Sequence, residues 1–177
     1  YVGSSDAALY ALEASSGKQI WKYEPGEKIL GGPNWVKATN GPAPWIIAGS
    51  YDFKLHCVDS ATGQAVWTYE TGNYINGSPA VSEGKTMFGG CDALLHVISL
   101  AHGQKVKEVE AGAYIAGSAA VDLFAGTGSM GLEALSREAA FCAFIDQDPR
   151  CVEVLIRNLA KLGFGTRAEV LAGDALR

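Results

Sequence analysis

The stretch GSAAVDLFAGTGSMG, residues 117–131, decides how this chain is organised, because two sequence patterns meet in it. Its first three residues match the opening of a repeat that fills the chain before them. Its last six residues form a G-x-G-x-x-G turn that follows a short apolar strand. The seam lies at Val121-Asp122. We therefore expect a repeat segment at residues 1–121 and a second, different unit at residues 119–177.

Composition changes at the same seam and limits the function. Every Trp, Tyr and His lies before residue 122, and every Arg lies after it. The formal net charge of −5 excludes a broad basic surface for nucleic acid, so any contact with RNA must be local. The four cysteines show no C-x-x-C spacing, which indicates neither a zinc site nor a disulfide framework. With neither a membrane-spanning apolar run nor a secretory signal apparent, we expect a cytoplasmic protein with no membrane partner.

Internal repeats dominate residues 1–121. ASSGKQIW at 14–21 returns 46 residues later as SATGQAVW at 60–67, and a further 40 residues later as LAHGQKVK at 100–107, where the aromatic residue is lost. A period of about 40–45 residues is typical of a propeller blade. Short alternating runs between Gly, Asp, Asn, Ser and Thr predict four antiparallel strands per blade. We count three strands of one blade, two full blades and a starting strand, whereas a closed propeller needs about 4–8 blades.

On the pattern Asp/Glu-x-x-Thr/Ser-Gly-x-x-x-Trp, residues 1–121 resemble the pyrroloquinoline-quinone-type β-propeller repeat. The resemblance implies that Trp21 and Trp67 dock one blade against the next. It implies no activity, because no calcium ligands, catalytic carboxylate or complete cofactor pocket can be placed. We therefore expect neither a quinone nor a metal.

Three residues of the repeats are candidates for chemistry by residue type alone. His56 and His96 are the best metal-ligand candidates, but they occupy the repeat position of Tyr10, which predicts a structural role on the blade face. Cys57 aligns with aliphatic residues of the other units and is expected to fill the core.

The second unit reads as alternating strands and helices. Strands are expected at 119–124, 141–145 and 168–171, and helices after Ser129 and after Asp148-Pro149, each of which is interpreted as a helix start. Gly163 stands near the end of the second helix. This β-α-β-α-β order predicts a parallel sheet.

Residues 121–137, VDLFAGTGSMGLEALSR, resemble the AdoMet-binding opening of the bacterial 16S ribosomal RNA guanine-N2 methyltransferases. An NAD-binding unit is less favoured, because Asp122 stands four positions before the first glycine and a Gly-Asp-Ala turn follows the third strand. The resemblance implies seven cofactor-binding residues. The methionine end is assigned to Asp122 and to the turn at Gly126 and Gly128, the ribose to Asp146, and the adenine to Asp174 and Ala175. Phe124 is the seventh residue and is assigned to no particular part of AdoMet. Simpler roles are a turn for Asp174 and a sheet-end hydrogen bond for Asp122.

The expected fold class is mixed: an incomplete propeller of antiparallel blades followed by a partial Rossmann-like three-layer α/β unit with parallel strands. The family's (Asn/Asp)-Pro-Pro-(Tyr/Phe) segment does not occur before the chain stops at Arg177, so we assign no catalytic residue. The favoured function is a fusion or fragment that binds AdoMet at best. One alternative is a propeller-type binding module with a structural tail, and another is a methyltransferase completed by a partner chain. RNA is a partner by resemblance only, and open blade and sheet edges favour a protein partner or self-association.

Overall fold

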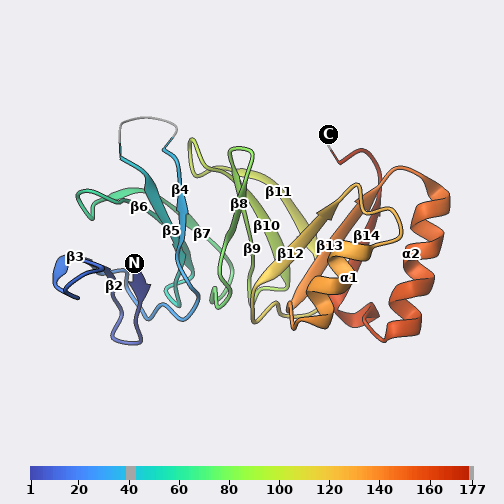
Figure 1. The fold of residues 1–177 in the computed structure, drawn as a ribbon, viewed down its shortest axis with the longest axis horizontal. Coiled ribbons are helices and arrows are strands. Elements are labelled where there is room, and N and C mark those ends of the chain that lie inside the picture. Colours follow the sequence, from blue (N-terminus) through green and yellow to red (C-terminus); the bar gives the residue numbers. More distant parts are fainter. Residues whose placement is uncertain (39–42, 176–177) are drawn as a thin grey trace.

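Four sheets follow one another along the chain in this computed structural model, which describes residues 1–38 and 43–175. Figure 1 shows them in a row along the longest axis of the molecule, from the N-terminal strands to the C-terminal helices. Three sheets are antiparallel and the fourth is parallel. The fold class expected from the sequence is therefore confirmed.

The antiparallel sheets are consecutive meanders in which each strand pairs with its neighbour in sequence. The first sheet has three strands, β1 (Val2–Gly3), β2 (Leu9–Leu12) and β3 (Gln19–Tyr23). The second has four, β4 (Asn34–Val36), β5 (Trp45–Gly49), β6 (Lys54–Asp59) and β7 (Ala65–Glu70). The third also has four, β8 (Ala80–Ser82), β9 (Lys85–Gly89), β10 (Leu94–Ser99) and β11 (Lys105–Glu110). These are the three strands of one blade and two full blades that the repeats predict.

Tryptophans join successive sheets at equivalent positions. The indole N–H of Trp21 donates a hydrogen bond to the carbonyl oxygen of Ser60 at 2.9 Å, in the turn after β6. Trp67 donates in the same way to Leu100 at 3.0 Å, in the turn after β10. Large aromatic side chains with one polar edge suit this role, because the ring is buried while its N–H keeps a partner. The structure thus shows the blade-to-blade docking that the repeat pattern predicts.

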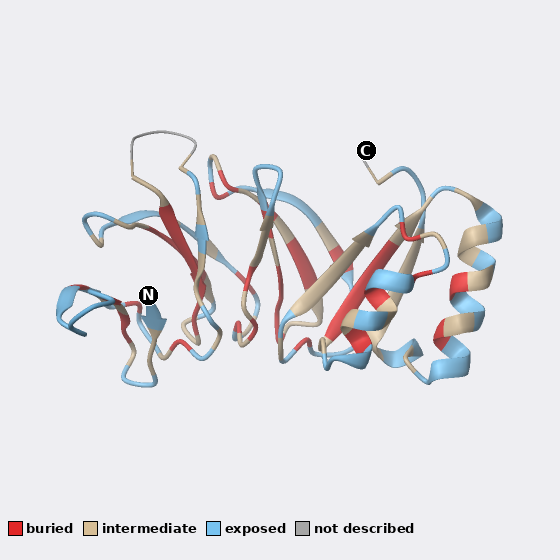
Figure 2. Ribbon diagram, in the orientation of Figure 1, coloured by how far each residue is buried: buried red, intermediate tan, exposed pale blue. Residues whose placement is uncertain are grey.

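The core lies between the sheets. Leu9, Ile46 and Val58 pack the first sheet on the second, and a second cluster, which includes Leu55 and Phe88, packs the second on the third. Cys57 is fully buried within it, as expected. Figure 2 shows buried segments on the inner strands of the sheets and in some of the loops that connect them, whereas the outer faces of the helices are exposed.

The fourth sheet is parallel and carries helices on one face. Its strands, in the order β12-β13-β14, are β12 (Ala119–Leu123), β13 (Phe141–Asp146) and β14 (Ala168–Ala172). The helices are α1 (Ser129–Ser136), α2 (Pro149–Leu162) and a short 3-10 turn, η1 (Gly165–Arg167). Leu135 of α1 and Leu155 of α2 pack on Phe144. The third layer is not a second set of helices but the third antiparallel sheet, which covers the other face.

The parallel sheet occupies the position of the next blade. Leu95, Val109 and Ile115 of the repeat segment form one buried cluster with Phe141 and Ala143 of β13. Ala140 also donates its backbone N–H to the carbonyl oxygen of Ser118 at 3.0 Å, just before β12. The segment before β8 of the third sheet is linked to the same place, because Ser78 donates its backbone N–H to the Ser118 hydroxyl at 3.2 Å. The parallel sheet thus continues the row of blades without being one.

The two helices start differently. Asp148 caps α2 by accepting the N–H of Arg150 at 2.9 Å, Pro149 is the first helical residue, and Gly163 ends the helix with φ 72°. These predictions are confirmed. The expectation that Ser129 caps α1 is wrong, because the cap position is Gly128, with φ 88° and no side-chain hydrogen bond. Gly128 is required there, since a Cβ would collide with Leu155.

The described residues meet neither the requirements of a membrane-spanning helix nor those of a metal site. None of the helices formed by residues 1–38 and 43–175 combines the length and apolar character needed to cross a bilayer. Over the same residues, no three His, Cys, Asp or Glu side chains gather in an arrangement that could hold a metal ion.

Candidate functional site

The turn between β12 and α1 is built from left-handed backbone. Phe124, Gly126 and Gly128 have φ values of 57°, 55° and 88°. A positive φ is rare for a bulky residue such as Phe124, whose side chain is 59% exposed. Gly128 closes the turn by donating its N–H to the carbonyl oxygen of Ala125 at 2.7 Å. The strand therefore ends abruptly and presents its glycine backbone at the carboxyl edge of the sheet.

The three glycines of this turn serve different purposes. A Cβ on Gly131 would collide with Phe144 and with Cys142, so this glycine lets α1 pack closely on β13. Gly128 has the same close relation to Leu155. A Cβ on Gly126, in contrast, would meet nothing within 4 Å. The backbone of Gly126 is thus the part of the turn that a ligand can approach.

Asp146, at the end of β13, accepts hydrogen bonds from several loops at the carboxyl edge of the parallel sheet. Its Oδ2 accepts the N–H of Gly126 at 2.7 Å, and its Oδ1 accepts the N–H of Asp148 at 2.8 Å. Its carbonyl oxygen accepts the N–H of Gly173 at 2.9 Å. Three loops, one from each strand end, therefore converge on one residue. A carboxylate offers about four acceptor positions, so two remain after the backbone bonds.

Asp122, in β12, contacts the first turn of α1 through its side chain. Its Oδ2 accepts the N–H of Gly131 at 2.8 Å, which ties β12 to the first turn of α1. An acidic side chain at a helix N-terminus is favourable, because the unpaired N–H groups there carry partial positive charge. The hydrogen bond agrees with the simpler role considered for Asp122, since it orients the turn.

Asp174 and Ala175 follow β14 in the third loop. Asp174 is exposed and Ala175 is half-buried. The bond from Gly173 to Asp146 fixes where this loop starts, so the structure brings Gly126, Asp146 and the Asp174 turn to one edge.

Helix α2 supports the glycine turn through Asn158, a residue that the sequence reasoning missed. The Asn158 side-chain amide donates to the carbonyl oxygen of Thr127 at 3.0 Å. Its helical spacing marks it only as a polar surface position, so no sequence signal identifies this contact. The hydrogen bonds from the Arg150 side chain and backbone lower the pKa of Asp148 to about 2, which keeps the cap ionised.

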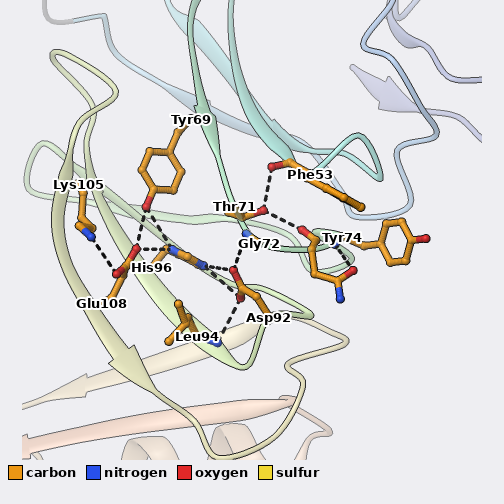
Figure 3. A network of polar contacts seen from close by, with 11 residues as sticks. Phe53, Tyr69, Thr71, Gly72, Tyr74, Asp92, Leu94, His96, Lys105 and Glu108 are labelled. Carbon is orange, nitrogen blue, oxygen red and sulfur yellow. Dashed lines mark hydrogen bonds and ion pairs between the residues drawn. The ribbon is translucent and has the colours of Figure 1, made fainter.

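A second polar cluster joins the second and third sheets (Figure 3). His96 Nε2 lies 3.1 Å from Asp92 Oδ2, and that carboxylate also accepts the N–H of Gly72 at 3.0 Å. Tyr69 donates its hydroxyl to Glu108 at 3.0 Å. Burial and then this bond raise the pKa of Tyr69 to about 12. All these groups are occupied with one another, which is the arrangement of a structural network.

The same network occurs between the first and second sheets. His56 lies 3.0 Å from Asp52 through Nε2 and 2.9 Å from the Tyr23 hydroxyl through Nδ1. In the first sheet the equivalent position is Tyr10, which donates to Asp6 at 2.7 Å. Both histidines thus hold blade contacts, as the repeat position predicts.

The N-terminal and C-terminal parts of the chain are similar to different known proteins. A model of the family described as "Outer membrane protein assembly factor BamB" matches residues 5–138. The crystal structure of BamB from Moraxella catarrhalis aligns with a TM-score of 0.50 and 19% identity, covering 60% of this chain and 30% of that one. This likeness shows the propeller fold of the repeats.

The C-terminal part matches different proteins. A family model described as "Conserved hypothetical protein 95" matches residues 106–177. YlbH of Bacillus subtilis, provisionally named an rRNA methyltransferase, is 42% identical over 57 residues, which are 32% of this chain and 31% of YlbH. "Ribosomal RNA small subunit methyltransferase D" of Escherichia coli is 46% identical over 56 residues, 32% of this chain and 28% of that protein. The chain therefore spans about a third of the length of these relatives, and it joins propeller repeats to a methyltransferase-family segment.

Proposed function

Because the chain belongs to the BamB family over residues 5–138, we propose that it is a propeller-repeat protein whose next blade is replaced by an AdoMet-binding unit at residues 119–177. In this proposal the unit binds AdoMet and does not itself transfer the methyl group. The observation that carries the proposal is the convergence of three loops on Asp146 beside the open backbone of Gly126. The similarity to ribosomal RNA methyltransferases supports the choice of ligand.

Each part of AdoMet has a matching group in this proposal. The backbone at Gly126 and Gly128 receives the methionine end, with Asp122 holding the turn from below and Phe124 flanking it. The acceptor positions left on the Asp146 carboxylate take the ribose hydroxyls. The turn at Asp174-Ala175 lies beside the adenine.

Methyl transfer to a base needs groups that these residues do not supply. None of the six prolines stands next to another, so no (Asn/Asp)-Pro-Pro-(Tyr/Phe) segment occurs in the sequence. Without a group that takes the proton of the target amine and a slot that holds the flipped base, bound AdoMet has no reaction partner. A segment outside residues 1–177 would have to provide both. We infer that the two parts are fused within β12, where Val121 suits both patterns.

The proposed function also implies where the protein is located and what it contacts. AdoMet binding fits a cytoplasmic protein. A contact with ribosomal RNA would be local, because the net charge is −5. Among the described residues, the outer strands β3 and β14 each pair on one side only, so their other edges are open to a protein partner or to a second copy.

One observation favours a second candidate, a binding module in which the parallel sheet is only a structural cap. Both oxygens of Asp146 already accept backbone N–H groups, at 2.7 and 2.8 Å, so the carboxylate has a structural role without any ligand. The two candidates differ in whether AdoMet binds.

Calorimetric titration of AdoMet into the purified chain tests the proposal. We expect saturable binding that Asp146→Asn weakens by about tenfold or more, since it removes a charged acceptor of the ribose hydroxyls. Glu153→Gln is the matched control, because it removes the same charge from an exposed side chain of α2 and is expected to bind AdoMet normally. Absence of binding would favour the structural-cap candidate, and binding that Asp146→Asn leaves unchanged would refute the site. Labelled methyl transfer to ribosomal RNA by the chain alone would contradict the second half of the proposal.

A further inference from the structure

A cavity of about 760 Å³ lies between the third antiparallel sheet and the parallel sheet. It is lined by β9, β10 and β11 on one side and by all three parallel strands on the other. A ligand pocket typically has about 300–1,000 Å³, so this one is large enough for a small organic molecule. It lies on the face of the parallel sheet that α1 and α2 leave uncovered.

The cavity has a clear origin in the repeats. Trp21 and Trp67 each fill the space before the next sheet, with the ring against a glycine of that sheet's turn. The third unit has Lys107 at the same repeat position, 40 residues after Trp67. The parallel sheet also lacks the turn that would receive an indole. The space that an aromatic ring fills in the other two junctions is therefore left open in the third.

The inner end of the cavity is apolar. Leu95 and Val109 line it from the third sheet, and Val121 and Ala143 line it from the parallel sheet. These side chains belong to or pack against the buried cluster that joins the two sheets around Phe141. The side chains of two facing sheets normally interdigitate and pack closely. At this cavity the apolar side chains of the two sheets do not meet, so they leave apolar surface that a ligand can cover.

The mouth of the cavity is polar and has two lysines. Val97 of β10 pairs with both Met87 and Lys107, and Ser99, two residues further on, pairs with Lys85. Since alternate residues of a strand share a face, both lysines lie on the wall that faces the parallel sheet. Among the described residues, neither lysine takes part in a side-chain ion pair. Glu83 and Asp174 also line the mouth, so the lysines must provide any contact to an anion.

We propose that this cavity binds a small anionic amphiphile, namely a carboxylate with an unbranched apolar tail. The tail lies between the two sheets toward Leu95 and Val121, where burial of each CH₂ group favours binding. The carboxylate lies at the mouth and accepts hydrogen bonds from Lys85 and Lys107. The site shares Asp174 and Ala175 with the one proposed for AdoMet but is otherwise distinct from it, because Gly126 and Asp146 do not line the cavity.

Fluorescence titration with dansyl-undecanoic acid tests this proposal on the full chain. We expect saturable binding, displaced by unlabelled dodecanoate. Lys107→Trp restores the aromatic residue of the other units and fills the cavity, so it should weaken binding by about tenfold or more. Lys161→Trp, on the exposed side of α2, introduces the same residue outside the cavity and should leave binding unchanged.

A second experiment tests the role of the carboxylate head group. It also keeps the proposal testable if the Lys107→Trp variant does not fold. The double variant Lys85→Gln, Lys107→Gln should bind the carboxylate probe about tenfold more weakly and bind the corresponding neutral alcohol as the unmodified chain does. Asp146→Asn should bind the probe normally, which separates this site from the AdoMet proposal. Equal affinity for the carboxylate and the alcohol in the unmodified chain, or unchanged binding in a folded Lys107→Trp variant, would overturn the proposal. So would light scattering that shows a dimer which the probe does not dissociate, because a second copy would then be the occupant.

Discussion

The ring of Trp67 lies directly over Gly103, so close that a Cβ on this glycine would stand 2.6 Å from the ring. The indole N–H then reaches the Leu100 carbonyl oxygen at 3.0 Å. Trp21 and Gly63 repeat this relation one sheet earlier, where a Cβ would stand 2.8 Å from the ring. The junctions between blades thus depend on a glycine in one sheet and a tryptophan in the other.

Replacing the glycine of this pair should destabilise the fold strongly. Gly103→Ala places a side chain at φ 64°, which costs about 1–2 kcal/mol, and the overlap with Trp67 adds about 1–3 kcal/mol. Gly112→Ala is the matched control, because its φ is 68° and a Cβ there meets nothing within 4 Å. Urea unfolding should show a clearly larger loss for Gly103→Ala. Equal losses would mean that the ring moves aside freely.

The glycine turn of the parallel sheet should respond to alanine in two different ways. Gly131→Ala collides with Phe144 and Cys142, so we expect its free energy of unfolding to fall by about 1–3 kcal/mol or more. Gly126→Ala has open space and costs only the strain of its φ of 55°, about 1–2 kcal/mol. Its methyl group would project toward the place where we propose that AdoMet binds. Calorimetry should therefore show weaker AdoMet binding in a Gly126→Ala variant that remains folded, and normal binding would exclude a close approach at this residue.

Stability should fall in acid because of Asp52. Burial raises the pKa of this carboxyl, but the hydrogen bond and charge of His56 and the N–H of Gly26 outweigh it and lower the pKa from 3.8 to about 2. The stabilisation is complete above pH 3.8 and is lost as the pH falls toward 2. We expect a loss on the order of 2 kcal/mol in the free energy of unfolding over this range.

Asp52→Asn isolates this contribution. Its free energy of unfolding should depend less on pH between about 4 and 2 than that of the unmodified chain, whereas Glu153→Gln should keep the full dependence. Thermal unfolding followed by circular dichroism across this range provides the measurement. If the stability of Asp52→Asn and that of the unmodified chain depended on pH in the same way, the ionised Asp52 carboxylate would not contribute to stability through the network around His56.

The four cysteines should differ in reactivity. Cys57, Cys91 and Cys142 are buried, and burial raises the pKa of all three thiols, to about 12 for Cys142. Cys151 in α2 is only half-buried. Since the thiolate is the reactive form, we expect one cysteine to react quickly with Ellman's reagent at pH 8 and three to react only on unfolding. Cys151→Ser should abolish the fast phase, and a fast phase that survives it would indicate that one of the junctions opens.

Much of the fold is predictable from local sequence. The repeat steps of 46 and 40 residues, the aromatic residues at 21 and 67, and the turn glycines predict the antiparallel sheets and their contacts. Asp148, Pro149 and Gly163 predict both ends of α2, since caps act within one turn of a helix. Short-range hydrogen bonds and strand alternation are properties of neighbouring residues, so the order of elements is contained in the sequence.

The relations between distant segments arise from packing. Nothing near Ala140 indicates that it bonds to Ser118 and lets the parallel sheet continue the row of blades, nor that Asp146 holds the N–H of Gly126, twenty residues away in sequence. The cavity beside Lys107 likewise exists only because one apolar face meets another of different geometry. Local patterns define which surfaces are apolar, whereas the free energy of close packing between whole sheets determines which of them meet and what space remains.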